Sequence, residues 1–535
     1  MRILLISPSS NRFYIPTAPL GISYLAAYLA PTTQVIGLDL NVLKWIYGLD
    51  ESGIRLSLDR YLYKSRFYQA KPDLIGITIY QETLPEALMV AELARQYRIR
   101  IVAGGIFPTL FPDQIPPVFD FLIRGAGEIP FQQLVTLLEQ RRMPLGETAD
   151  FQIPGLSVLG TSGRAATPRW IHFGAPAPLH MASRVIPRRE IFEELNLGFN
   201  YYSARVLSSH GCPYQCSFCA NSSFSREWRP RPAADVVAEV TALVNQPKIS
   251  EISFADDQFF GFTPLDYERA FQILHAIAEI SAVKNIRVNL QARPDHFLNA
   301  LAAQPKLEEV IKTINRNFTD PGDLKISAKI HGRAIRGFSL DLGVESFLED
   351  RLAGFTKGLT VDEIRTAIRK ARELEVDLGV YMILFTPDLT WEQLWKEWAI
   401  YYQEVLASAP FSRAAFFNFF QELVPYQGTP LYECLKTQGR LVSQGNFTGF
   451  KFADPRVALF YLLYNHQLQA GLFELEKAGL LRKMDDLLRI SAEFRTRASN
   501  PALLESVIAQ VVCECKDSSF MEKLYREIVR ILPGV

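Results

Sequence analysis

Three cysteines near the middle of the chain have the residue type and spacing to hold an iron–sulfur cluster. Cys212, Cys216 and Cys219 follow a C-x3-C-x2-C pattern in a segment that also contains glycine, proline and aromatic residues. Thiolates this close together on one loop can bind three irons of a cubane cluster, which usually takes four cysteine ligands. The missing fourth ligand would leave one iron open to a small molecule.

A zinc site is the alternative for clustered cysteines. A structural zinc ion takes four ligands, usually from paired C-x2-C arms or from one arm and a downstream histidine pair. The sequence has no second arm, and His210 is adjacent to the motif and poorly placed to serve. In a cytosolic chain, three clustered cysteines are more typical of metal binding than of disulfides. Cys434, Cys513 and Cys515 lie far away in sequence and are interpreted as ordinary buried or surface thiols.

The composition is typical of a globular protein. The 535 residues are 48% hydrophobic and 21% charged, and the formal net charge is zero. Such a chain has room for about three domains and gives no overall positive field for nucleic acid or an anionic membrane. Met1–Pro8 is too short for a signal peptide, and no apolar run is long enough to cross a membrane. We therefore expect a cytoplasmic protein with no nucleic-acid partner and no membrane insertion.

Residues 1–145 alternate short apolar runs with segments of helical periodicity. The expected strands are 2–7, 34–40, 73–79, 100–103 and 119–124, and the expected helices are 19–29, 84–97 and 130–139. This alternation predicts an α/β fold with a doubly wound, Rossmann-like parallel sheet. The alternative is a helper sheet without a ligand, and the absence of G-x-G-x-x-G spacing argues against a dinucleotide.

Small and polar residues stand where these strands end. Parallel sheets of this kind bind ligands at the carboxyl ends of their strands. Those ends carry Ser7–Ser9, Thr78, Gly104-Gly105 and Gly125–Glu128. Small residues there would let the backbone approach a large ligand closely.

The rest of the chain is expected to form a linker, a partial barrel and a helical domain. Residues 146–200 read as a linker with one hairpin near 156–170, because proline, glycine and threonine are frequent. Residues 201–435 again alternate strands and helices, which predicts a partial (β/α)6 barrel with its chemistry at the strand ends. Residues 436–535 are expected to form a C-terminal helical domain, with helices 455–470, 474–496 and 501–532.

The expected barrel has six strands and one unusual connection. The strands are 205–208, 251–255, 286–291, 338–343, 377–385 and 414–421, and the helices are 233–244, 264–282, 298–313, 360–375 and 390–406. The connection 316–337 is long and basic for a link between a helix and a strand. It is either a lid over a substrate or a surface excursion.

The cysteine motif, with Phe218 before Cys219 and a strand ahead of it, resembles the radical S-adenosylmethionine (SAM) superfamily. The segment 252–260 (ISFADDQFF) is similar to the family segment that meets the SAM amino group, although many members have Gly-Gly-Glu there. Gly343-Val344-Glu345-Ser346, followed by Lys357-Gly358, resembles the family's G-[IV]-E-S segment. The resemblance implies a [4Fe-4S] cluster whose open iron binds SAM, with SAM contacts from Phe218, Asp256, Asp257, Gln291, Arg293 and Glu345. Each polar residue alone could instead be a satisfied structural group.

The N-terminal motifs together resemble the cobalamin-binding subfamily of radical SAM enzymes, and this resemblance spans nearly residues 1–435. They are 19–21 (PLG), 75–78 (IGIT), 103–105 (AGG) and 124–128 (RGAGE). The resemblance implies cobalamin contacts from Ser9, Gly21, Thr78, Gly104, Gly105, Gly125 and Glu128. The D-x-H-x-x-G cobalt-ligating motif is absent, because Asn41 stands where the histidine would be. Cobalamin would therefore bind without that histidine ligand.

The family resemblance implies a methyltransferase that acts on an unactivated carbon through a 5′-deoxyadenosyl radical and methylcobalamin. Two alternatives stay open: a cyclase or rearrangement enzyme with the same cofactors and no methyl transfer, and a non-catalytic cobalamin- or cluster-binding regulator. The expected partners are a small-molecule or natural-product substrate and an electron donor such as flavodoxin or ferredoxin.

Overall fold

The structure is a computed structural model, and it describes residues 1–9, 17–67, 71–140, 152–160, 168–175, 178, 181, 185–195, 199–221, 225–320, 335–407, 413–444, 447–469 and 482. The chain divides into two compact units. The first contains residues 1–211 and 227–256, and the second contains residues 212–226 and 257–535. The domain boundaries at 145, 200 and 435 stay predictions.

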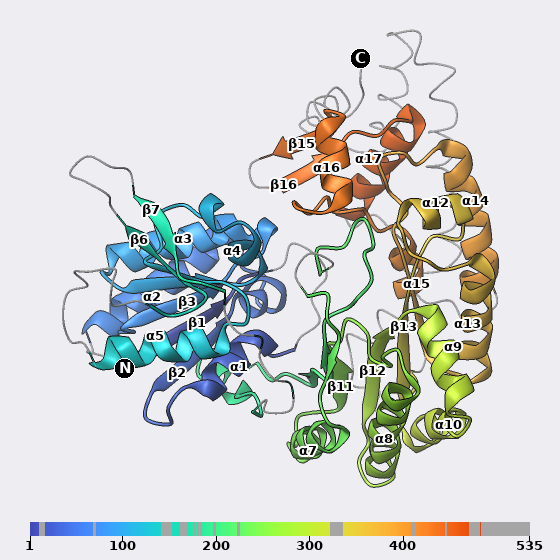
Figure 1. The fold of residues 1–535 in the computed structure, drawn as a ribbon, viewed down its shortest axis with the longest axis horizontal. Coiled ribbons are helices and arrows are strands. Elements are labelled where there is room, and N and C mark those ends of the chain that lie inside the picture. Colours follow the sequence, from blue (N-terminus) through green and yellow to red (C-terminus); the bar gives the residue numbers. More distant parts are fainter. Residues whose placement is uncertain are drawn as a thin grey trace. The chain divides into compact units, whose positions relative to one another are not determined.

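The first unit is built on a sheet with the strand order β2-β1-β3-β4-β5-β6-β7 (Figure 1). Its parallel strands are β1 (Arg2–Ser7), β2 (Gln34–Asp39), β3 (Leu74–Thr78), β4 (Arg100–Gly104) and β5 (Phe121–Ile123). The chain reverses its winding direction between β1 and β3. The ligand crevice of an open α/β sheet lies at such a switch point, outside the carboxyl ends of the strands.

Helices cover both faces of this sheet, as the doubly wound prediction requires. α1 (Leu20–Tyr28) and α5 (Glu128–Gln140) contribute to the core on one face, and α2 (Glu51–Phe67) and α3 (Leu84–Gln96) to the core on the other. The sequence did not predict α2. Its buried stripe is narrow, with Ile54, Leu58 and Leu62 set among charged and polar residues, so its apolar signal is weak.

The predicted hairpin extends the same sheet. β6 (Leu156–Gly160) and β7 (Arg169–His172) pair with each other in antiparallel fashion, and β6 pairs with β5 in the same way. The first unit also contains β8 (Ser203–Val206) and β11 (Glu251–Phe254), which pair in parallel. α7 (Ala233–Val244) lies between them in sequence, as predicted, and completes a β-α-β unit.

The second unit contains the parallel strands β12 (Arg287–Ala292), β13 (Phe338–Glu345) and β14 (Asp377–Met382). Its larger helices are α8 (Pro264–Ser281), α9 (Pro294–Ala303), α10 (Leu307–Asn317), α13 (Val361–Glu373) and α14 (Trp391–Tyr401) (Figure 1). Thr263, Thr360 and Thr390 begin three of these helices with capping boxes. Such a box satisfies free backbone N–H groups in the first turn.

Two predictions for this unit are wrong. The segment 414–421 forms α15 (Arg413–Phe419) and not a strand, because a short apolar run does not distinguish the two by itself. Its Phe416 and Phe419 pack on Trp398. An isolated parallel bridge joins Phe385 to Glu422, one residue beyond the expected strand. The predicted helix 298–313 is divided into α9 and α10 at Pro305, since the residue before a proline is disfavoured in a helix.

The C-terminal part contains one expected helix, at 455–470, and a hairpin that was not predicted. It contains α16 (Pro430–Thr437), the hairpin β15 (Leu441–Gln444) and β16 (Phe447–Phe450), and α17 (Pro455–Gln469). The helices expected at 474–496 and 501–532 lie outside the described residues, apart from residue 482, as does most of the connection 316–337. Within the described part of the chain, no helix is both long and apolar enough to cross a bilayer.

Candidate active site

The cysteine loop begins at Gly211, whose backbone conformation would be strained in any other residue. Gly211 has a φ of +91°, a conformation that glycine adopts more easily than other residues. The N–H of Cys212 then donates to the Ser225 carbonyl at 3.0 Å, and the N–H of Cys219 donates to the Cys216 carbonyl at 3.1 Å. These bonds fold the three cysteines onto one short loop.

Ser217 anchors the middle of the loop to two other segments. Its N–H donates to the Phe355 carbonyl at 2.9 Å, and its Oγ donates to the Gly354 carbonyl at 3.0 Å, at the end of α12 (Glu349–Gly354). Its carbonyl accepts from the N–H of Leu431 at 3.1 Å. Phe218, the predicted SAM contact, packs edge-on against Phe355 with ring centroids 5.4 Å apart. No pattern of residues indicates this anchoring role of Ser217.

The environment of the thiols suits a cluster ligand set. Cys216 is buried, and Cys212 and Cys219 are partly exposed. Burial raises the pKa of the Cys212 thiol, the negative charge of Asp257 and of the other two cysteines raises it further, and the N–H of Tyr214 lowers it. Three thiols on one loop, close enough for the charge of two to raise the pKa of the third, suit three irons of a cluster. No set of three or more His, Cys, Asp or Glu side chains suited to a single metal ion occurs in the described ranges.

Tyr214, inside the cysteine loop, is held by two side chains. The guanidinium carbon of Arg293 lies 3.7 Å from the centroid of its ring. Its hydroxyl lies 2.7 Å from Nε2 of His296, and Nδ1 of His296 lies 2.5 Å from the Gly261 carbonyl. Because a carbonyl only accepts, Nδ1 carries the proton and Nε2 accepts from the tyrosine hydroxyl. The sequence did not predict a role for Tyr214 or His296.

Glu345 lies at the carboxyl end of β13 in an unusual backbone conformation. Its φ is +70°, and the strand register shifts between Gly343 and Glu345. The buried Nζ of Lys357 lies 2.8 Å from Glu345 Oε1. Backbone strain of this kind gathers at ligand-binding sites, where the surrounding structure must enforce it. Glu345 is therefore well suited to the predicted SAM contact, with Lys357 as its partner.

A buried glutamate supports the turn that follows Glu345. Glu397 in α14 is fully buried and accepts from the Ser346 hydroxyl, from the Phe347 N–H at 2.8 Å and from Arg351 at 2.8 Å. Arg351 also donates to the carbonyls of residues 383 and 384, which follow β14. The Glu397 carboxylate thus links α14 to the turn after β13 and to α12, and Arg351 extends the link to the residues after β14. Buried charge is tolerated only when it is paired and hydrogen-bonded in this way.

The other predicted SAM contacts lie in different surroundings. Asp256 is buried in the first unit, where its carboxylate accepts from the N–H and hydroxyl of Ser208 and from the hydroxyl of Ser209. Asp257 is exposed and accepts from Asn221, at the end of the cysteine loop, at 2.5 Å. Gln291 is exposed near the end of β12. Asp257 and Gln291 thus expose side chains that could meet a ligand, whereas Asp256 orders the chain ahead of the cysteines.

In the first unit, two predicted contacts lie at the switch point of the sheet. Ser9, after β1, donates from its N–H and its hydroxyl to the carboxylate of Glu86, at 2.5 and 2.8 Å. Thr78 ends β3 and is partly exposed. Asn41, where a histidine would be needed to ligate cobalt, is buried and donates to the Pro8 carbonyl and the Asp39 carboxylate. An amide committed to its own chain is poorly suited to reach a metal.

The glycines after β4 and β5 are joined by one threonine. Gly105 has a φ of +109°, and a side chain there would come within 2.8 Å of the Ile79 carbonyl. Thr109 donates to the Gly105 carbonyl at 2.7 Å and accepts from the N–H of Gly125 at 2.8 Å. Gly125 also has a positive φ, of +74°. Thr109 therefore holds the two turns together at the carboxyl ends of β4 and β5, which are part of the ligand edge of the sheet.

The three remaining predicted cobalamin contacts differ in how much space surrounds them. A side chain at Gly21, near the start of α1, would meet nothing of the protein within 4 Å. A side chain at Gly104 would be in ordinary contact with the Ile123 carbonyl at 3.7 Å. Glu128 is buried at the start of α5. Gly21 is exposed, so nothing in the described protein itself requires a glycine there.

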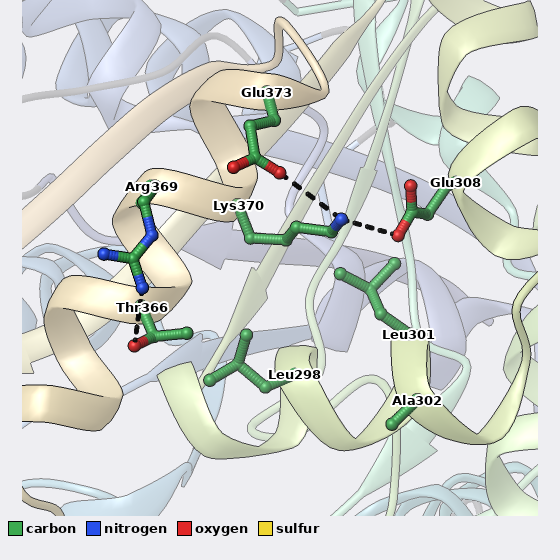
Figure 2. A pocket seen from close by; sticks show the side chains of 8 residues that line it. All are labelled: Leu298, Leu301, Ala302, Glu308, Thr366, Arg369, Lys370 and Glu373. Atoms are coloured by element: carbon green, nitrogen blue, oxygen red, sulfur yellow. Dashed lines mark hydrogen bonds and ion pairs between the residues drawn. The ribbon is translucent and has the colours of Figure 1, made fainter.

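A hollow of about 260 Å³ lies among the helices of the second unit. Its walls come from α9, α10 and α13, and Lys370 bridges Glu308 and Glu373 across it (Figure 2). None of the predicted site residues lines it. The strand ends and the cysteine loop, and not this hollow, carry groups that could bind the expected cofactors.

Comparison with known proteins agrees with this geometry. The family model of the radical SAM superfamily matches residues 206–397, and the model of the B12 binding domain matches residues 12–135. The chain belongs to the cobalamin-dependent radical SAM enzymes. The cofactors of this family are a [4Fe-4S] cluster, SAM and cobalamin, and the loop and strand ends described above offer groups that fit all three.

Two relatives of this radical SAM enzyme differ in the reactions their names state. The uncharacterized methyltransferase PH0819 of Pyrococcus horikoshii is 26% identical over 485 residues, which cover 86% of this chain and 88% of the relative. The anaerobic magnesium-protoporphyrin IX monomethyl ester cyclase of Rubrivivax gelatinosus is 28% identical over 273 residues. That match covers 48% of this chain and 45% of the cyclase, so this chain spans less than half of that relative.

A solved structure shares the fold of this radical SAM enzyme over most of its length. It is the cobalamin-dependent SAM radical enzyme OxsB with aqua-cobalamin and SAM bound. The match has a TM-score of 0.62 at 16% identity and covers 98% of this chain and 78% of the OxsB chain. The predicted fold class is thereby confirmed.

Proposed function

We propose that this radical SAM enzyme transfers a methyl group to an unactivated carbon of a small-molecule substrate. One observation carries the proposal: a B12 binding domain and a radical SAM domain occur in one chain that matches a methyltransferase over 86% of its length. When bound, cobalamin would carry the methyl group, and SAM on the cluster would supply the 5′-deoxyadenosyl radical that removes a substrate hydrogen atom.

The cysteine loop is proposed to hold the cluster and keep one iron open. Cys212, Cys216 and Cys219 would each bind one iron as thiolates. Ser217 fixes the middle of the loop to the ends of other segments, which limits movement of the thiols. Such fixation matters, because a catalytic group misplaced by about 1 Å can lose about a hundredfold in rate.

The residues around Glu345 are proposed to orient SAM. Its carboxylate accepts hydrogen bonds and suits the hydroxyl or ammonium groups of the cofactor. Asp257, exposed beside the cysteine loop, is a second acceptor for a cationic group. Phe218 and Gln291 complete the proposed contacts. Asp256 and Arg293 are engaged within the protein and would act by holding the chain around them.

The ligand edge of the first unit is proposed to hold cobalamin. Ser9 and Thr78 would contribute at the switch point, and the glycine turns at 104–105 and 125, after β4 and β5, would provide a backbone surface. Glu128, at the start of α5, and Gly21, near the start of α1, complete the proposed contacts. The buried Asn41 offers no ligand to cobalt. When bound, cobalamin would supply the methyl group, and these residues would hold it at this edge of the sheet.

A cyclase is the second candidate, and one observation favours it: the 28% identity to the magnesium-protoporphyrin ester cyclase over 273 residues. An enzyme of either kind needs an external electron to start the radical reaction. We propose flavodoxin or ferredoxin as the donor. A chemical reductant can replace it in the test.

The test uses the full chain reconstituted with iron, sulfide and cobalamin without oxygen, and SAM that carries a deuterated methyl group. Deoxyadenosine and S-adenosylhomocysteine are measured with and without cobalamin, and extracts of the source cells are searched for a labelled product. Methyl transfer predicts both nucleosides and a labelled product, with S-adenosylhomocysteine dependent on cobalamin. Deoxyadenosine without S-adenosylhomocysteine or label favours the cyclase. Cofactor binding without either nucleoside would mean a regulator.

A further inference from the structure

Arg293 was predicted to contact SAM, but the protein itself already uses most of its hydrogen-bonding groups. Its Nε and Nη2 bind the Asp295 carboxylate at 3.0 and 3.2 Å. Its Nη1 donates to the Lys357 carbonyl at 2.8 Å, and Nη2 also lies 3.5 Å from the Gly358 carbonyl. The side chain is only 7% exposed. A guanidinium has five N–H donors, so little capacity remains for a ligand carboxylate.

The flat face of Arg293 points at the cysteine loop. Its guanidinium carbon lies 3.7 Å from the ring centroid of Tyr214, two residues after Cys212. The far end of that ring is fixed by His296, which is itself fixed by the Gly261 carbonyl. Cation–π contacts of this kind are strongest where water is excluded, and the Arg293 side chain is almost fully buried. The cysteine loop therefore contacts Arg293 through the ring of Tyr214.

The edge of Arg293 points at the segment that holds Glu345. The carbonyls of Lys357 and Gly358 accept from the guanidinium, and the ammonium of the same Lys357 binds the Glu345 carboxylate at 2.8 Å. Gly358 has a φ of +63°, a conformation that lets this segment turn back. One side chain thus contacts both the loop proposed to bind the cluster and the segment proposed to orient SAM.

We infer that Arg293 is a positioning residue that sets the cluster loop and the Glu345–Lys357 pair in a fixed relation. The inference rests on the proposed function, because it assumes a cluster on this loop. It assigns Arg293 two separable effects. Its planar guanidinium fixes the Tyr214 ring relative to the carbonyls of Lys357 and Gly358. Its positive charge lies beside the cysteine loop, where it stabilises a reduced and more negative cluster.

Two substitutions separate shape from charge. Arg293→Gln removes the positive charge and leaves Asp295 without its partner, so the midpoint potential of the cluster should become more negative. Arg293→Lys keeps the charge but loses the flat face and the paired donors. We expect Arg293→Lys to keep the potential near that of the wild type and to bind SAM about tenfold more weakly, the loss typical of one charge-assisted contact.

Substitutions at Tyr214 test the same contact from the other side. Tyr214→Leu removes the ring on which Arg293 lies, and Tyr214→Phe removes only the hydroxyl bound to His296. Tyr214→Leu should broaden the electron paramagnetic resonance spectrum of the reduced cluster and weaken SAM binding, and Tyr214→Phe should do so much less. Arg287→Gln is the matched control, because Arg287 is a buried, ion-paired arginine at the opposite end of the same strand.

The measurements are iron per chain, the resonance spectrum with and without SAM, the midpoint potential and the SAM dissociation constant, all on the reconstituted full chain. Circular dichroism checks folding, and if Arg293→Gln fails to fold, Arg293→Lys and Tyr214→Leu decide. A wild type without a cluster would overturn the proposed function. A normal wild-type cluster with Arg293 and Tyr214 variants that match Arg287→Gln would overturn this inference alone.

Discussion

Lys357 Nζ lies 2.8 Å from Glu345 Oε1, and Glu345 is one of four non-glycine residues with a positive φ in the described part of the chain. Both side chains are almost fully buried. An ion pair out of water is stable only if both partners stay in place, and the loss of one leaves an uncompensated charge. The pair therefore maintains a strained strand end, which is proposed to bind SAM.

The pair predicts a non-additive double-mutant cycle. Glu345→Gln and Lys357→Met should each lower the free energy of unfolding by about 3 kcal/mol, because each strands a buried charge. The double variant should lose much less than the sum, since it strands neither. Urea unfolding measures the stabilities, and SAM binding should weaken in all three variants. Additive losses would show that the two residues act separately.

The cysteine loop predicts that one thiol decides cluster assembly. Cys216→Ala should abolish the brown absorbance of the reconstituted protein and all SAM cleavage, because the two remaining thiolates cannot retain the cluster. Iron and sulfide analysis and deoxyadenosine formation measure the two losses. Cys434→Ala is the control, since that thiol is exposed and lies far from the motif in sequence. Full iron content in Cys216→Ala would contradict the assignment of this loop.

Thr109 predicts a local defect in cobalamin binding. Thr109→Val removes the hydroxyl that joins the Gly105 and Gly125 turns and leaves a partly buried N–H without its acceptor, at a cost of about 1–3 kcal/mol. Cobalamin affinity should fall, and cluster content should not change. Thr136→Val is the matched control, because its hydroxyl bonds only to its own helix. Equal cobalamin affinity in both variants would argue against a ligand at this edge.

His296 predicts a loss of stability in acid. Burial lowers its pKa, so the folded protein holds the neutral imidazole, whereas the unfolded chain takes up a proton near pH ~6.5. Stability from this group is therefore complete above pH ~6.5 and is lost as the pH falls toward the lower pKa of the folded state. Protonation also removes the acceptor for the Tyr214 hydroxyl.

The pH dependence of unfolding distinguishes this group from other titrating residues. Between about pH 7 and about pH 5, the wild type should lose more stability than His296→Gln. His275→Gln, which changes an exposed histidine on α8, should follow the wild type. If the His296→Gln and His275→Gln curves were parallel to that of the wild type, His296 would not be the responsible group.

The cofactor domains and their order were predictable from local patterns of residues. The spacing of Cys212, Cys216 and Cys219 is local information, because three ligands within eight residues must lie on one loop. The doubly wound sheet was also predictable, since buried parallel strands have continuous apolar runs that alternate with amphipathic helices. The segment 414–421 was predicted wrongly for a related reason: a run of aromatic residues satisfies a buried strand and a buried helix equally well.

Which polar residues are engaged within the protein depends on the folded chain and could not be predicted from local patterns. Arg293, Asp256 and Glu345 resemble one another in sequence as polar residues at strand ends. Folding places Arg293 on Tyr214, Asp256 on two serine hydroxyls, and Glu345 against Lys357 in a left-handed backbone. These partners lie 12 to 79 positions away along the chain. Contacts over such separations depend on how strands and loops assemble, and no local pattern records them.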